Sequence, residues 1–270
     1  MSVEILKASD GKYLTDGVVI CKVVRLAEGK KQSNWYEITK EEYDWLTHKE
    51  DVEDPLFWDD FTNTGNRTDY SYAFAHWSQS EIIPSNTLRA DKVVYRFMEC
   101  KNLMNADNIR VLVKNDNPSM QGFCMGNIKM INSPSVMFRK SDGSPTTVVR
   151  TWVSAYANCV SMESCSVYLG DGTQDPIGMR NSMQNTFVNN KSLKHLTFEG
   201  KGSPLYLDLS DCKELSYESM ISLRDSLMDV SSASSGNYDI KIAAESFALL
   251  NDEDKSSFGV LGWNIVVMDE

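Results

Sequence analysis

The chain has 270 residues, of which 41% are hydrophobic and 24% charged, a composition close to that of an ordinary globular protein. Its formal net charge of −11 argues against non-specific binding to nucleic acid or to anionic membranes, which requires a basic surface. We therefore expect no nucleic acid and no membrane among its partners. No apolar run approaches the ~18 residues of a membrane span. The opening residues lack the pattern of a secretory signal. We therefore expect a protein that is made inside the cell and keeps its thiols reduced.

Residues 1–48 predict a small α+β module. The stretches "VEILKA" and "VVICKVVRLA" have strand composition, and "SDGKYLTDG" between them has turn composition. The following "WYEITKEEYDWLTHKE" predicts a short helix, with Thr39 as N-cap and Glu42 completing a capping box. Because Trp35 and Trp45 are more apolar surface than so small a unit should leave bare, we expect this module to be the attachment device of the protein.

Residues 49–70 predict a linker in which acidic residues alternate with aromatic ones. Phe57 and Trp58 are its most apolar pair. These side chains either pack on the first layer of the next domain or form a docking peptide for another subunit. The acidic run "EDVEDPLFWDD" lacks the ligand spacing and the turn glycine of a calcium loop, which favours a solvated linker over a cation site.

From about residue 71 the chain repeats a seven-residue motif. Most copies have an apolar residue, then Cys or Asn three places later, then Leu or Met three places after that. The copies are "FAHWSQS", "FMECKNL", "CMGNIKM", "YANCVSM", "FVNNKSL" and "LSDCKEL", and their last residues lie 23, 27, 32, 31 and 22 residues apart. Such a period is typical of a solenoid. We expect an inward Asn to bind buried backbone groups of the adjacent turn, and Cys100, Cys159 and Cys212 to be buried and reduced.

A short strand accompanies most copies of the motif. The predicted strands cover residues 108–113, 135–140, 166–171, 195–200 and 205–210. Stacking one strand per turn predicts a parallel sheet along one face of a curved solenoid. The C-terminus predicts a cap, with a helix after Ser216, a strand in "YDIKIAA", a short helix ending near Gly262 and a last strand in "WNIVVMD".

The F-x-x-C/N-x-x-L columns resemble the BspA-like leucine-rich repeats. The tail "LDLSDCKELSYESMISLRDSL … LLNDEDKSSFGVLGWNIVV" is similar to the closing repeat of such proteins in tailed bacteriophages of gut bacteria, including crAss-like phages. The opening "ILKASDGKYLTDG … RLAEG … WYEITKEEYDWL" resembles an N-terminal module of such phage proteins. The resemblance implies an α/β repeat fold, a short irregular leucine-rich-repeat solenoid with a C-terminal cap at 71–270, preceded by the small α+β module. The repeats depart from the family in being few and uneven and in carrying Met130 and Met162 in place of Leu.

This resemblance implies a non-enzymatic virion structural protein that is associated with a fibre, baseplate or collar. It would attach by residues 1–48, present its solenoid to other virion proteins or to a host surface receptor, and be located in the virion after synthesis in the host cytoplasm. A homo-oligomer is expected, with a trimer as one candidate. A bacterial cell-surface leucine-rich-repeat adhesin and an interaction scaffold are the alternatives, and the missing signal peptide counts against the adhesin.

No motif in the sequence predicts catalysis. A G-x-S-x-G elbow, a Walker loop and a C-x-x-C pair are all missing from the chain, which has only three histidines. We therefore expect no catalytic residue, no metal site and no cofactor.

The outward side chains of the predicted sheet are the candidate contact surface. Period-two alternation places Ile109, Val111 and Val113 inward, and likewise Val136 and Phe138. The side chains expected to form an outward ladder on one surface are Arg110, Met137, Arg139, Tyr168 and Thr197. Such a face serves either as a contact surface for a partner or as an ordinary solvated sheet face.

Overall fold

The computed structural model describes residues 93–101, 103–104, 106, 109–233 and 238–269, together with three short strands nearer the N-terminus. These strands are β1 (Tyr13–Thr15), β2 (Tyr36–Ile38) and β3 (Leu88–Ala90). Strand β1 pairs antiparallel with β2. The turn expected at "SDGKYLTDG" was therefore wrong, because its Tyr-Leu-Thr triplet suits a strand and pairs with Tyr36–Ile38. The other predictions for 1–48, and the linker at 49–70, lie outside the described residues.

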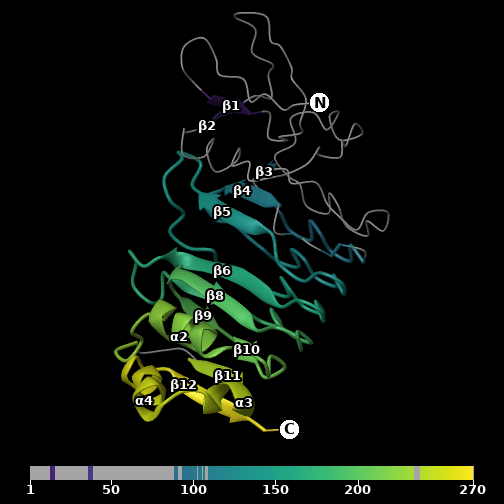
Figure 1. Cartoon of the computed structure of the whole chain (residues 1–270). Coiled ribbons are helices and arrows are strands. Elements are labelled where there is room, and N and C mark those ends of the chain that lie inside the picture. The colour runs from purple at the N-terminus through teal and green to yellow at the C-terminus, as the bar shows by residue number, and fades with distance from the viewer. Residues whose placement is uncertain are drawn as a thin grey trace, which may run out of the picture.

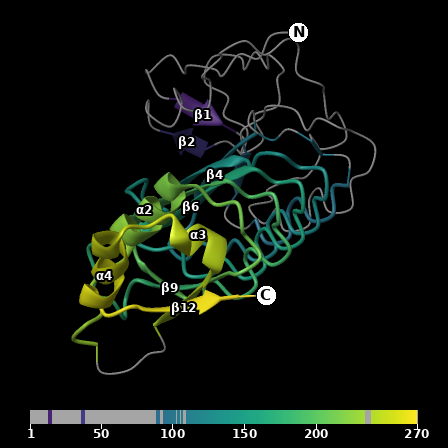
Figure 2. The same ribbon diagram turned by 60° about the horizontal axis from the view of Figure 1, so that its bottom comes forward.

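From residue 93 onward the chain winds in turns that stack on one another, with strands along one side and tight turns along the other (Figures 1 and 2). The strands are β4 (Arg110–Lys114), β5 (Ser135–Arg139), β6 (Ser164–Asp171), β7 (Arg180–Ser182), β8 (His195–Lys201), β9 (Ser203–Leu205) and β10 (Asp208–Leu209). Strands β3, β4 and β5 pair in parallel, as do β6 with β8 and β7 with β9. Because these pairs are parallel, the paired strands of successive turns run in the same direction.

The tight turns have a repeated backbone conformation. Each of four successive turns contains two residues in the left-handed region, four positions apart. These pairs are Tyr95 and Glu99, Gly122 and Gly126, Ser154 and Asn158, and Asn185 and Asn189, with φ between 53° and 77°. Backbone hydrogen bonds such as Cys124 N to Ala155 O (2.7 Å) and Tyr156 N to Thr186 O (3.1 Å) join one turn to the next. They place Cys124 level with Phe97 and Tyr156, so a thiol occupies a position that is aromatic in both neighbouring turns.

The Cys/Asn column of the repeat lies inside the stack. Cys100, Asn127, Cys159, Asn190 and Cys212 are all at most 1% exposed, which confirms the predicted burial of the three cysteines. None of these three cysteines forms a disulfide within the described residues. The backbone N–H of Cys100 donates to Asn127 Oδ1 (2.7 Å), and that of Cys159 donates to Asn190 Oδ1 (3.0 Å). In the other direction, the Cys159 thiol donates to the Cys124 carbonyl (3.1 Å). Asn and Cys therefore alternate because each satisfies a different backbone group of the preceding turn.

Helix α2 (Tyr217–Ser226) takes the place of the next strand beside β8. Its N-cap is Ser216, whose side chain accepts from Ser219 N, as the sequence predicts. The Ser219 hydroxyl accepts from Leu196 N (2.9 Å), and the Ser222 hydroxyl accepts from Phe198 N (2.9 Å). The helix thus satisfies the backbone edge of β8 with serine side chains, where another strand would use its own backbone.

The end of the stack contains β11 (Asp239–Ala243), α3 (Ala244–Ala248), α4 (Asp252–Val260) and β12 (Asn264–Met268). Strands β10, β11 and β12 form a parallel sheet in that order. The single strand predicted at 205–210 was wrong, because Tyr206 has φ 62° and separates β9 from β10. Among the described residues, no helix has the length and apolar character required to cross a bilayer.

Candidate functional site

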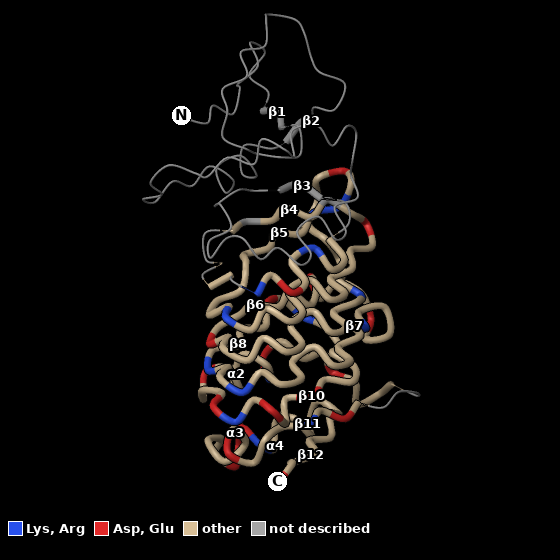
Figure 3. Tube along the Cα trace, turned by 90° about the vertical axis from the view of Figure 1, so that its right-hand side faces the viewer, with Lys and Arg blue, Asp and Glu red and all other residues tan. Residues whose placement is uncertain are grey.

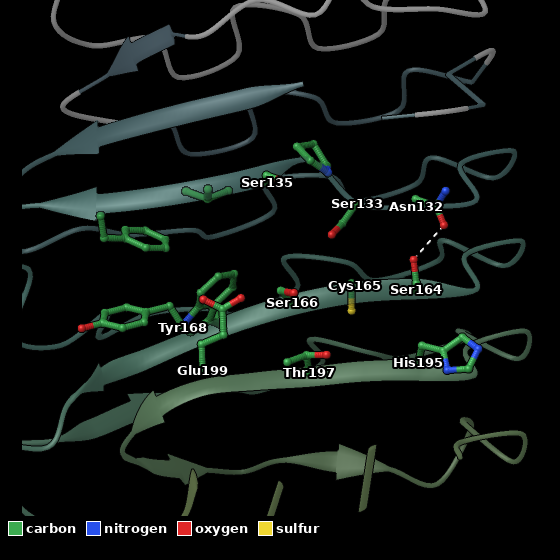
Figure 4. Close-up of a pocket in the computed structure, with 14 residues that line it drawn as sticks. Asn132, Ser133, Ser135, Ser164, Cys165, Ser166, Tyr168, His195, Thr197 and Glu199 are labelled. Carbon is green, nitrogen blue, oxygen red and sulfur yellow. Dashed lines mark hydrogen bonds between the residues drawn. The ribbon is translucent and has the colours of Figure 1, made fainter. Parts of the chain in front are cut away.

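The sheet pairing is interrupted between β5 and β6 (Figures 1 and 4). Ser133 N donates to Ser164 O (3.1 Å), and Ser164 N donates to Ile131 O (3.2 Å). Beyond this point, within the described part of the chain, no backbone hydrogen bond joins residues 134–138 to residues 165–168. We call the opening between these two stretches the slit. It contains a cavity of about 490 Å³, within the size range of ligand-binding pockets.

Local sequence explains why pairing stops at the near end of the slit. Asn132 and Ser164 form the last bridge, and the Ser164 hydroxyl donates to Asn132 Oδ1 (2.7 Å). Pro134 lines the slit directly afterwards, and proline has no N–H to donate to a neighbouring strand. The strand edge of β5 consequently leaves that of β6 at this residue.

The far end of the slit is closed by the loop that follows β5. Lys140 N donates to Ser144 O (2.7 Å), which turns the chain back so that Pro145 bridges Arg139. Tyr168 reaches across this end, where its hydroxyl donates to the Thr146 carbonyl (2.9 Å) and its ring stacks on Phe138 with centroids 5.7 Å apart. Burial, with a smaller contribution from Asp171, raises the pKa of Tyr168 to about 12, so this hydroxyl keeps its proton at neutral pH.

The inner wall of the slit is aromatic. Trp152 packs edge-on against Phe138 (6.0 Å between centroids) and stacks on Tyr156 (6.2 Å). Trp152 is 1% exposed, and its Nε1–H has no hydrogen-bond partner among the residues that the structure describes. A buried, unpaired donor beside a cavity is costly unless something in the cavity accepts from it.

The rim of the slit is polar and mostly uncharged (Figure 4). Its side chains are Asn132, Ser133, Ser135, Ser164, Ser166, His195, Thr197 and Glu199. Hydroxyl and amide groups of this kind bind ligands by hydrogen bonds. No group of three or more His, Cys, Asp or Glu that could hold a metal ion occurs in the part of the chain that the structure describes.

The predicted outward ladder is divided by this arrangement. Tyr168 and Thr197 line the slit, and Met137 and Arg139 belong to β5 at its edge. In the pairing of β6 with β8, Thr197 lies opposite Ser166, and Tyr168 lies opposite Glu199. In the pairing of β4 with β5, Met137 lies opposite Leu112. The predicted residues therefore do not form a single row across the sheet.

Tyr168 is level with the exposed Glu199, on the same face of β6 as Ser166, and its half-buried ring leans over the slit onto Phe138. Arg110 is level with Ser135, and its side chain lies outside the described part, as do Trp35, Trp45, Phe57 and Trp58.

Sequence reasoning missed the slit and its inner wall. Trp152 belongs to no motif column, and the slit depends on a break in pairing that no residue pattern states. Two signals were available, Pro134 just before a predicted strand and the 32-residue interval that contains the loop after β5. Comparison of the chain with protein-family models, curated proteins and solved structures found no match.

Proposed function

We propose that this chain is a non-enzymatic binding protein of a bacteriophage particle. In this proposal residues 1–48 attach it to the particle, and the stacked turns form a leucine-rich-repeat solenoid that contacts other virion proteins or a host receptor. The observation that supports a binding role is the slit, an open cavity with a polar rim and an aromatic inner wall in an otherwise paired sheet face. Stacked repeats commonly use such an extended face for partners.

The surface chemistry favours contacts that do not depend on one sign of charge. On the side of the stack that carries the tight turns, shown in Figure 3, acidic and basic residues are interspersed, and the strand face is described by the rim of the slit. The exposed Ser166 and Thr197 are neutral, and His195 and Glu199 lie on the same strand, β8. We propose protein or receptor surfaces as partners for this face, with nucleic acid and membrane excluded from the proposal.

The virion assignment depends on the resemblance of the opening and tail segments to phage proteins. Mass spectrometry of particles purified from a host that produces this chain tests it directly, and we expect the chain in stoichiometric amounts. Deleting residues 1–60 should leave a folded remainder that no longer enters particles. A chain found on bacterial surfaces and missing from particles would favour the adhesin instead.

The role of the sheet face is tested separately from attachment. Thr197→Arg enlarges an exposed side chain at the slit and should leave the melting temperature nearly unchanged while reducing host adsorption or particle assembly. The matched control is Asn117→Arg, at an exposed loop position. Unaltered adsorption and assembly with Thr197→Arg would contradict a contact role for this face. Sedimentation of the purified chain tests the proposed homo-oligomer.

A further inference from the structure

We propose that the slit binds a short extended peptide segment, which inserts between β5 and β6 as an additional strand. This inference rests on the proposed binding role and specifies the chemistry of the partner at that site. The partner would be recognised first through its main-chain N–H and C=O groups, as in other strand additions to exposed sheet edges.

The β5 side of the slit presents unpaired backbone groups. Ser135 N donates to Ile109 O (2.9 Å) and Arg139 O accepts from Asn115 N (2.9 Å), so these residues direct their backbone groups toward β4. Because backbone groups of successive strand residues point alternately to the two sides, those of Val136 point toward β6. Among the described residues, Val136 has no backbone partner on that side.

The β6 side of the slit also presents backbone groups that point into the cavity. His195 N donates to Glu163 O (2.9 Å), which starts the parallel pairing in which alternate residues of β6 bond to β8. Ser164 bonds to the β5 side, and by the same alternation the N–H and C=O of Ser166 point into the slit. Within the described part of the chain they have no backbone partner there. Two strand edges of the same direction therefore face each other across the cavity.

The protein already places an extended segment between these strands at the far end of the slit. Pro145 bridges Arg139 of β5, and Val148 bridges Gly170 of β6. Asp171 N donates to Thr147 O (2.9 Å). Since neighbouring strands lie about 4.7–4.9 Å apart, an intervening segment separates the two edges by roughly 9.5 Å. An inserted peptide would extend this separation toward Pro134.

Elsewhere the chain covers an interrupted sheet edge with its own side chains. The serine hydroxyls of α2 bind the backbone of β8 at Leu196 and Phe198. The slit also has serine-rich walls, but within the described residues no side-chain hydrogen bond reaches the backbone of Val136 or Ser166. An extended peptide supplies both donors and acceptors at the required spacing, and one of its side chains could meet the Trp152 wall.

The experiment separates backbone recognition from side-chain recognition. A display library of short linear peptides is selected on the full chain, and the enriched peptides are measured against two variants. Ser166→Pro removes the slit-facing N–H and leaves the pairing of β6 with β8, whereas Ser166→Ala removes only the exposed hydroxyl. We expect Ser166→Ala to bind like the original chain and Ser166→Pro to bind about tenfold or more weakly, as for the loss of one backbone hydrogen bond.

N-methylation of alternate peptide amides provides a measurement that does not depend on the folding of a variant. It should abolish binding, while amide exchange at Val136 and Ser166 should slow when the unmodified peptide binds. Failure to enrich any peptide overturns the proposal, as does binding that Ser166→Pro and N-methylation leave unchanged. Loss of binding with Ser166→Ala overturns it in favour of a small hydroxylated ligand held by side chains. Each result is independent of whether the chain is found in particles, so the two proposals fail separately.

Discussion

Replacing Asn190 and Asn127 by leucine, one at a time, measures the contribution of the Cys/Asn column to stability. Both side chains are fully buried, and each carbonyl oxygen accepts the N–H of a cysteine in the preceding turn. Leucine has the same branched arrangement of four side-chain heavy atoms but no acceptor. The substitution removes the carboxamide acceptor of a buried N–H, and an N–H that loses its acceptor costs about 1–3 kcal/mol. Cys159 N keeps its longer bond to Tyr156 O (3.3 Å).

The two variants should differ because the amide nitrogens differ. Asn127 Nδ2 donates to Met130 Sδ (3.8 Å). Asn190 Nδ2 has no partner within the described part of the chain, so Asn190→Leu also removes a buried unpaired donor. We expect Asn127→Leu to lie at the upper end of the range and Asn190→Leu at the lower end. For a domain of this size each kcal/mol lowers the melting temperature by roughly 2–4 °C.

Thermal unfolding followed by circular dichroism is the assay, with Asn117→Ala, at an exposed position, as the control. The control should stay within about 0.5 kcal/mol of the original chain. Leucine variants as stable as the control would refute the account of the column, and a larger loss at Asn190 than at Asn127 would refute the role given to the amide nitrogens.

Three further outcomes follow from the structure. Ser219→Ala with Ser222→Ala should destabilise the chain by about 1–3 kcal/mol for each N–H left unpaired, and hydrogen exchange should accelerate at Leu196 and Phe198 but not at Cys100. Gly200→Ala should destabilise the chain by more than the ~1–2 kcal/mol that a left-handed conformation costs an alanine, because Gly200 has φ 75° and an added Cβ would also collide with the Gly170 carbonyl. Denaturant titration checks this, with Gly259→Ala as the control, since a Cβ at Gly259 would meet open space. Burial raises the pKa of Cys159 from 9.0 to about 12, so the native state keeps a proton that the unfolded state loses, and stability should fall as pH rises from 9 toward 12. A Cys159→Ala variant with an unchanged slope over that range would contradict this last assignment.

Residue patterns predicted most of the elements on the strand side of the stack. Strands β5 and β8 begin at the predicted residues, and Ser216 caps α2. These features depend on local alternation and capping chemistry, which a sequence states directly. The inward Asn was also predictable, since a buried carboxamide in a repeated column needs backbone partners in the adjacent turn.

The remaining features depend on contacts between turns. Strand β7 has too few residues for a period-two pattern, and it forms only because β9 lies beside it. The slit requires that Pro134 and the loop at 140–149 act together on two strands thirty residues apart in the chain. Alternation places Tyr168 on the outer row of β6, but it does not state that the ring reaches across the slit to Phe138 and Thr146, because that contact depends on the break in pairing. The register between two strands depends on both strands, so the residue pattern of one segment does not predict it.

The alternation of Asn and Cys has a consequence for how such a chain can change its length. The Asn127 and Asn190 carbonyl oxygens accept from the turn before them, and the Cys159 and Cys212 thiols donate to the turn before them, so two turns form the unit that repeats both kinds of bond. Duplicating or deleting one turn would set two cysteine turns or two asparagine turns side by side, and either change removes one of the bonds that join neighbouring turns. Duplicating or deleting a pair preserves the pattern, and the Ser246 hydroxyl, which donates to the Cys212 carbonyl (2.9 Å), can end a stack of either length. Variants that grow or shrink by pairs of turns should therefore be tolerated far more often than those that differ by one.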